Sequence, residues 1–87
     1  MYVIMAYDIG EKRVNKVLKT GRKYLTWVQN SLLEGEITHA KLHKLKLEIK
    51  RITVKEEDSV YWYILRDKSL MQKEFHGVEK DKVDMFV

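Results

Sequence analysis

The chain begins with an unbroken run of apolar side chains. Residues 2–7 are all apolar and rich in aromatic and β-branched types, and the run stops at Asp8. A short continuous apolar run is typical of a central strand that is covered on both faces. Residues 60–65 (VYWYIL) repeat the pattern. We therefore predict two central strands, one early and one late in the chain.

Two other segments, residues 11–23 and 38–52, have the spacing of amphipathic helices. The apolar positions recur at intervals of three, four and seven, which places one apolar stripe on a helix. They are Val14, Val17 and Leu18 in the first segment, continued by Tyr24 and Leu25 just after it, and Leu42, Leu45, Ile49 and Ile52 in the second. Thr38 is the predicted N-cap of the second helix, and Leu47 falls on its solvent side.

The remaining segments are predicted with less detail. Residues 27–37 form an extended stretch that includes Gly35, and they predict either one long strand or two short strands broken near residues 34–35. Residues 55–58 (KEED) predict a charged turn. The tail, residues 68–87, ends on apolar side chains, so we expect it to add a strand to a sheet edge, its own or that of a partner subunit.

The order strand, helix, strand region, helix, strand is the split βαβ pattern of ferredoxin-like domains. Right-handed crossovers place both helices on one face of the sheet. The other face then has no helix, although its side chains are apolar. We therefore predict an α+β fold, a single ferredoxin-like βαββαβ domain over residues 1–87 with an additional C-terminal strand, in which a two-fold-related copy covers the open face.

Composition narrows the classes of function. A chain of 87 residues fits one domain with a thin core. It has no cysteine for a disulfide or a thiolate zinc site, and its three histidines lack zinc-finger spacing. The opening segment lacks the basic start of a signal peptide, and no stretch approaches the roughly 20 apolar residues of a membrane span. The sequence thus predicts a cytoplasmic protein with no membrane contact.

Positive charge is concentrated in the two predicted helices. Residues 11–23 carry six basic side chains and one acid, and residues 38–52 carry five and one, whereas the rest of the chain has six basic and eleven acidic residues. A joint basic surface of this kind binds the phosphate backbone of RNA or DNA, although lysine-rich faces also serve solubility alone. The predicted nucleic-acid-binding residues are Lys12, Arg13, Lys16, Lys19, Arg22, Lys41 and Lys44.

Asp8 is the first candidate for chemistry, because a carboxylate at a strand end sits where a rigid element meets a loop. An aspartate before Gly10 is also a common turn or N-cap residue. Glu34 and Glu36 share one face of an extended segment, as a second carboxylate site or as solvated edge residues. The aromatic residues Tyr61, Trp62 and Tyr63 serve either to stack bases or, more commonly, as core or interface side chains.

Four segments together suggest a family. YVIMAYDIG, the basic EKRVNKVLK, WVQNSLLEGEIT before the lysine-rich helix, and EEDSVYWYILRD cover the chain from its start to about residue 67. In these segments the chain closely resembles the second CRISPR-associated (Cas) protein family, the small adaptation subunit also described as an endoribonuclease. At two positions linked with nuclease activity it departs from that family, with Trp27 where many members have arginine and Leu33 where many have phenylalanine.

The resemblance implies a ferredoxin-like homodimer whose C-terminal strand completes the partner's sheet. It also implies a role with the integrase subunit in spacer acquisition for antiviral defence, and magnesium-dependent cleavage of RNA or DNA. Asp8 of each subunit would hold one Mg²⁺ across the two-fold axis, because the ion relieves the repulsion between two carboxylates. Arg13 matches the basic residue expected early in the first helix and would stabilise charge on the phosphorus.

We therefore predict a CRISPR-associated, metal-dependent endonuclease, an endoribonuclease that also acts on DNA, with Asp8 and Arg13 as catalytic residues and Mg²⁺ as cofactor. Two alternatives stay open from the sequence. One is a non-catalytic scaffold that binds DNA within the adaptation complex. The other is a toxin-type ribonuclease of related fold.

Overall fold

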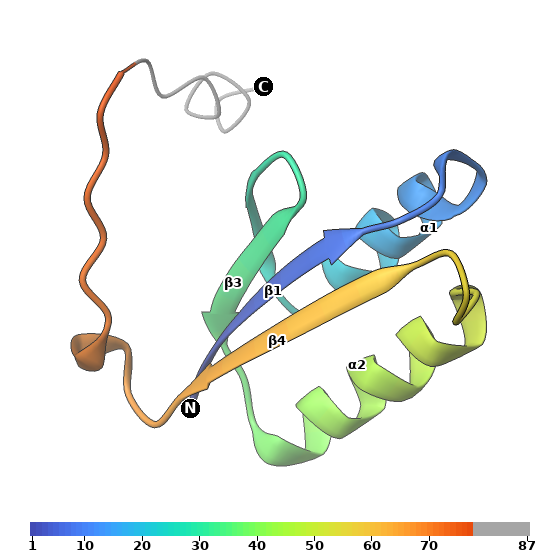
Figure 1. Cartoon of the computed structure of the whole chain (residues 1–87). Coiled ribbons are helices and arrows are strands. Elements are labelled where there is room, and N and C mark those ends of the chain that lie inside the picture. Colours follow the sequence, from blue (N-terminus) through green and yellow to red (C-terminus); the bar gives the residue numbers. More distant parts are fainter. Residues whose placement is uncertain (78–87) are drawn as a thin grey trace.

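The computed structural model describes residues 1–77 and confirms the α+β, ferredoxin-like arrangement. Four strands form one antiparallel sheet in the order β2-β3-β1-β4, with two helices on one side (Figure 1). A 3₁₀ turn, η1, follows the last strand. The elements are β1 (Tyr2–Asp8), α1 (Glu11–Gly21), β2 (Thr26–Gln29), β3 (Leu32–Glu36), α2 (His39–Ile52), β4 (Ser59–Leu65) and η1 (Lys68–Leu70).

The core lies between the sheet and the helices. Alternate side chains of β1, namely those of Val3, Met5 and Tyr7, are buried on the helix side, as the period of two in a strand requires. They pack against the apolar stripes of both helices, including Val17 and Leu45. Because β1 is central in the sheet, this core holds the strand that ends at Asp8 from one side along its whole length.

The first helix is shorter than predicted. It ends at Gly21 rather than Lys23, because the next amides turn back within the chain: Leu25 N–H donates to the Gly21 carbonyl at 2.8 Å. This turn buries Leu25 and starts β2. A Cβ atom at Gly21 would lie 2.5 Å from Leu33 Cδ1, so only glycine allows the helix to approach β3 this closely.

The extended stretch forms two strands, and the break lies at residues 30–31 rather than at the predicted 34–35. Asn30 has a positive φ of 38°, a conformation that asparagine tolerates better than most residues. Its carbonyl accepts a hydrogen bond from Trp27 Nε1 at 2.8 Å. Gly35 instead lies within β3, opposite Val3 and next to Leu25.

The second helix agrees with the prediction in its N-cap, its buried side and its exposed side. Thr38 is the N-cap, and its Oγ1 accepts a hydrogen bond from Lys41 N at 3.2 Å. Leu42, Leu45 and Ile49 are buried, and Ile52 packs at the edge of the core. Leu47 is 42% exposed.

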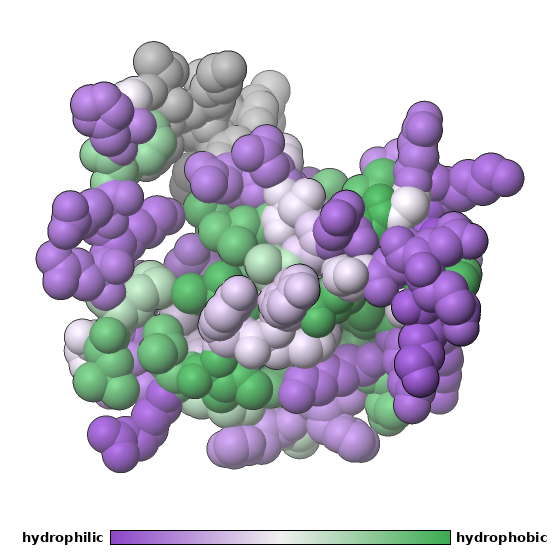
Figure 2. Space-filling model, in the orientation of Figure 1, coloured by the Kyte–Doolittle hydropathy of each residue, from purple (hydrophilic) through white to green (hydrophobic). Residues whose placement is uncertain are grey.

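The sheet face away from the helices carries no helix. Its end at Tyr2 is covered, because Tyr2 is 6% exposed and Lys68 Nζ lies 5.6 Å from the centroid of its ring, but the part around Ala6 and β4 is open in the single chain. Tyr61 and Tyr63 of β4 are 60% and 54% exposed. They lie opposite Ala6 and Ile4 of β1, which belong to the same face. Figure 2 shows apolar and intermediate residues gathered over the sheet strands, with hydrophilic residues around them.

The described part of the tail lies beyond η1 and forms no strand over residues 71–77. Lys73 Nζ lies 4.0 Å from Glu34 Oε1 of β3. The apolar end on which the additional C-terminal strand was predicted lies outside the described residues. Within residues 1–77, neither helix has the length and apolar character to cross a membrane.

Candidate functional site

Asp8 lies at the end of β1 and is exposed. It pairs with Ser59 of β4 in the strand ladder, and strand alternation places its side chain on the open face with Ala6. Within residues 1–77 its carboxylate makes no hydrogen bond or ion pair. The N-cap of α1 is Gly10, which has no side-chain cap, so the turn or N-cap role considered for Asp8 is wrong.

One chain supplies one carboxylate at this position. Among the described residues, no three histidine, cysteine, aspartate or glutamate side chains gather to hold a metal ion. Mg²⁺ binds through one or two carboxylates and keeps several waters. An exposed, unpaired Asp8 therefore fits half of a magnesium site, and the second protein ligand would have to come from another copy of the chain.

Arg13 is held by carboxylates of its own chain. Its Nε donates to Asp58 Oδ2 at 2.6 Å, and its Nη2 donates to Asp58 Oδ1 at 2.9 Å and to Glu57 Oε1 at 3.0 Å. The Arg13 side chain is 20% exposed. Its guanidinium, helped by two backbone amides, holds the pKa of the Asp58 carboxyl well below its usual range. A catalytic contact between Arg13 and phosphate stays a prediction.

Asp58 was not among the predicted site residues, because the sequence indicated only a charged turn at residues 55–58. Its side chain is fully buried, and its carboxylate also accepts hydrogen bonds from the amides of Gly10 (2.8 Å) and Val54 (2.7 Å). Four donors from three segments thus meet one buried carboxylate, as a buried charge requires. This cluster joins the loop after Asp8 to the turn that leads into β4.

The predicted basic residues spread along both helices. Lys12, Lys16, Lys19, Arg22, Lys41 and Lys44 are all exposed, whereas Arg13 is half-buried. Because α1 begins just after β1, Lys12 and Arg13 lie at the Asp8 end of the sheet. They line a hollow of about 700 Å³ with Gly10, Glu11 and Glu57. Lys41 starts α2 at the other end, so the predicted set does not converge on one point.

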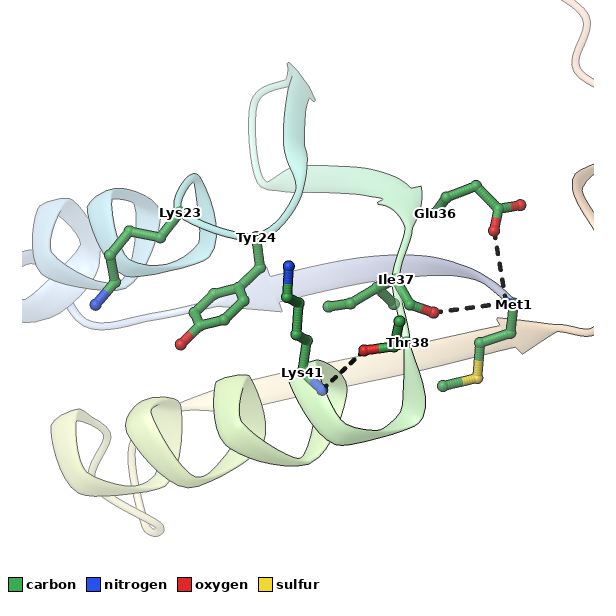
Figure 3. Close-up of a pocket in the computed structure, with 7 residues that line it drawn as sticks. All are labelled: Met1, Lys23, Tyr24, Glu36, Ile37, Thr38 and Lys41. Carbon is green, nitrogen blue, oxygen red and sulfur yellow. Dashed lines mark hydrogen bonds and ion pairs between the residues drawn. The ribbon is translucent and has the colours of Figure 1, made fainter.

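A second hollow, of about 390 Å³, lies at the end of the sheet opposite Asp8 (Figure 3). It is lined by Met1, Lys23, Tyr24, Glu36, Ile37, Thr38 and Lys41. The Met1 ammonium lies 3.5 Å from Glu36 Oε2, while Lys23 Nζ lies 2.6 Å from Glu48 Oε1. Lys23, followed by the Tyr24 hydroxyl, lowers the pKa of Glu48. Two of the basic groups around this hollow are therefore already neutralised within the chain.

The sequence motifs match the model of the family described as CRISPR associated protein Cas2 over residues 1–73. The chain belongs to this Cas2 family. A relative from Dictyoglomus turgidum named "CRISPR-associated endoribonuclease Cas2" is 56% identical over 82 residues, 94% of each chain. A relative of the same name from Thermotoga maritima is 55% identical over 80 residues, 92% of each chain.

Solved structures of the Cas2 family have the same fold. One described as "Crystal structure of cas2" matches with a TM-score of 0.85 and 46% identity, over 92% of this chain and 90% of that one. Cas2 from Streptococcus pyogenes matches with a TM-score of 0.75 and 26% identity, over 87% of this chain and all of the other. The fold expected from the resemblance is therefore confirmed.

The two departures from the Cas2 pattern have structural positions that the sequence did not indicate. Leu33 is fully buried under Gly21 of α1, so its side chain belongs to the core and not to the open face. Trp27 packs at the edge of the core, and the Arg22 guanidinium carbon lies 6.0 Å from the centroid of its ring. Both side chains contribute to packing on the helix side of the sheet.

The other acidic and aromatic candidates differ in burial and in the face of the sheet on which they lie. Glu34 is buried, not solvated, because its Oε2 accepts a hydrogen bond from Tyr2 Oη at 2.6 Å, and burial followed by this carboxylate raises the pKa of Tyr2. Glu36 is exposed. Trp62 points to the helix side beside Lys46, whose Nζ is 5.7 Å from the ring centroid, in a groove between α2 and β4. Of the three aromatic candidates of β4, Tyr61 and Tyr63 lie on the open face and Trp62 does not.

Proposed function

We propose that this chain is a CRISPR-associated, magnesium-dependent endonuclease that works as a homodimer on RNA, with action on DNA as well. The position of Asp8 carries the proposal: it is an exposed carboxylate with no partner within residues 1–77, at the end of a rigid central strand. The relatives named endoribonucleases support the same reaction class. In a homodimer, Asp8 of each subunit would hold one shared Mg²⁺.

The open face supports the dimer. It exposes Tyr61 and Tyr63 beside the apolar side chains of Ile4 and Ala6 on a sheet that has helices on only one side. Apolar sheet faces of this kind are stabilised when a second layer covers them. A two-fold-related copy would provide that layer, and it would bring the two Asp8 side chains toward the axis because they belong to the same face.

The chemistry divides between the ion and the chain. Bound Mg²⁺ would supply a Lewis acid and lower the pKa of water for attack on a phosphodiester. Asp8 would fix the ion, and the exposed lysines near the start of α1 would attract and orient the phosphate backbone. A bound substrate would approach Asp8 from the end of the sheet at which Lys12 and the start of α1 lie.

The cellular task that we propose is spacer acquisition together with the integrase subunit, as the family resemblance implies. The basic surface favours a second candidate function, a non-catalytic scaffold that holds DNA in the adaptation complex. The two candidates make different demands on Asp8, because only cleavage needs a metal ligand there. Both need the lysines of the helices.

Cleavage by the wild-type chain is expected to depend on Mg²⁺. Without the ion the site would hold two close carboxylates and no Lewis acid, so chelation by EDTA should stop the reaction and added Mg²⁺ should restore it. The measurement is a magnesium titration of cleavage of a labelled single-stranded RNA and a DNA duplex. Equal cleavage in EDTA and in Mg²⁺ would refute the metal mechanism, and no cleavage of either substrate would favour the scaffold.

Neutralising three lysines of α1 is expected to weaken nucleic-acid binding in a salt-dependent way. Lys12, Lys16 and Lys19 are exposed and share one helix face by their spacing. If all three contact phosphates of a duplex, replacing them with glutamine should reduce the slope of log K against log salt by about 2 to 3. Fluorescence anisotropy at several salt concentrations measures the slope.

The control carries the same change of charge outside α1 and α2, with Lys55, Arg66 and Lys68 replaced by glutamine. Its slope should stay close to that of the wild type. Equal slopes for the two triple variants would mean that the protein's overall charge, and not the α1 surface, governs binding.

A further inference from the structure

The buried carboxylate of Asp58 has no part in the function proposed above, yet it contacts the loop that follows Asp8. We propose that Asp58 and Arg13 form a clamp that positions Asp8 for metal binding, with Asp58 as a positioning residue that touches neither metal nor substrate. This inference rests on the proposed role of Asp8 as a metal ligand. It gives Arg13 a role through Asp58 rather than through direct contact with phosphate.

The clamp holds the chain on both sides of Asp8. On one side, Asp58 directly precedes Ser59, which pairs with Asp8 in the ladder between β1 and β4. On the other side, Asp58 Oδ1 accepts the Gly10 amide at 2.8 Å, two residues beyond Asp8. The Asp8 carboxylate makes no contact of its own within residues 1–77, so its position depends on the backbone that Asp58 holds.

Arg13 keeps the Asp58 carboxylate in place. Its guanidinium donates through Nε and Nη2 to the two oxygens of Asp58, at 2.6 Å and 2.9 Å, which is the bidentate geometry that fixes an arginine and a carboxylate relative to each other. The Val54 amide donates to Oδ2 at 2.7 Å from the other side. With these contacts the buried carboxylate has little freedom to shift.

Gly10 makes room for the clamp. A Cβ atom at this position would lie 2.5 Å from Arg13 Nη2 and 3.4 Å from Asp58 Oδ1. The backbone of Gly10 has φ −55°, a value that any residue adopts, so the requirement for glycine here is space and not conformation. An alanine at this position would push the guanidinium away from Asp58 while leaving the strand and the helix intact.

The test compares Asp58→Asn with Glu57→Gln. Both changes convert a carboxylate to an amide at neighbouring positions, but the Glu57 side chain is 66% exposed, and within residues 1–77 its carboxylate pairs with Arg13 alone. Asp58→Asn replaces one acceptor oxygen by a donor that faces other donors. Groups that hydrogen-bond a metal ligand directly contribute about 10- to 100-fold to metal affinity. Asp58 acts through the backbone, so Mn²⁺ binding, followed by electron paramagnetic resonance, should weaken by about 10-fold in Asp58→Asn, the lower end of this range.

Two further readouts separate positioning from general stability. Hydrogen exchange of the Gly10 and Val54 amides, which both donate to Asp58, should become faster in Asp58→Asn, measured well below the melting temperature of each variant. Affinity for a DNA duplex without metal should stay within about twofold of the wild type, since the exposed lysines are unchanged. Glu57→Gln should match the wild type in all three measurements.

Gly10→Ala provides an independent disruption of the clamp, and it decides the matter if Asp58→Asn does not fold. Like Asp58→Asn, it should weaken Mn²⁺ binding and speed amide exchange at residues 10 and 54. Wild-type amide exchange in a folded Asp58→Asn or Gly10→Ala variant, or unchanged Mn²⁺ affinity in either, would overturn the clamp. If instead the wild type binds Mn²⁺ no better than Asp8→Ala, the proposed function fails, while faster exchange in Asp58→Asn would still support the contact with the loop.

Discussion

Replacing Asp8 by alanine is expected to reduce magnesium-dependent cleavage by about a thousandfold, the order found when an electrostatic element of an active site is removed. The effect is large because the protein is proposed to act as a homodimer, so one substitution removes both carboxylates that hold the shared ion. Asp8 is exposed and makes no hydrogen bond within residues 1–77, so its loss should not disturb the fold. Single-turnover cleavage rates measure the effect.

The matched control is Glu56→Gln, which removes another exposed carboxylate on the turn before β4. It should cleave at the wild-type rate. Melting temperature, dimerisation and metal-free binding of a DNA duplex should be the same for wild type, Asp8→Ala and Glu56→Gln. Full activity in Asp8→Ala would exclude the proposed metal ligand, whereas lost duplex binding in this variant would mean that Asp8 has a structural role instead.

Local patterns were sufficient to predict the elements of the fold. The apolar runs of β1 and β4, the helical spacing in α1 and α2, and the cap at Thr38 each depend on residues close in sequence, and the structure confirms them. The hairpin was predicted at the wrong place because Gly35 is the usual signal of a break. Here Gly35 lies inside β3, and Asn30 adopts the positive φ instead.

The site was only partly predictable, because some of its contacts join residues that are far apart in the sequence. Asp8 could be found because a strand end is visible in the sequence. Asp58 could not, because its burial depends on Arg13, which is 45 residues away, and charged residues in a row are usually solvated. Glu34 is a second example, since its partner Tyr2 lies 32 residues away. Buried charges are recognised only once the fold brings their partners together.

The open face was predictable from the pattern of apolar side chains together with the topology. The sequence shows apolar side chains on both sides of the central strands, while the topology puts both helices on one side. The structure then identifies which aromatic side chains of β4 are exposed: those of Tyr61 and Tyr63, but not that of Trp62 between them. The proposed dimer can therefore be tested at two alternate positions of a single strand.

Replacing Tyr61 and Tyr63 by threonine is expected to separate the proposed dimer into monomers. Buried aromatic residues at the centre of an interface often contribute about 2 kcal/mol or more each, so the double change should weaken dimerisation by roughly a thousandfold. Threonine keeps a high strand propensity, and both side chains point away from the core, so β4 should stay folded. Analytical ultracentrifugation over a range of concentrations measures the dissociation constant.

The control is Leu47→Gln, which removes an apolar side chain that is also exposed, but on the outer side of α2. It should dimerise as the wild type does, because α2 lies on the opposite side of the sheet. The tyrosine variant should also lose cleavage, since a monomer brings only one Asp8 to the metal. A tyrosine variant that is monomeric yet fully active would show that one carboxylate is enough, and a variant that remains dimeric would place the subunit interface elsewhere than on the open face.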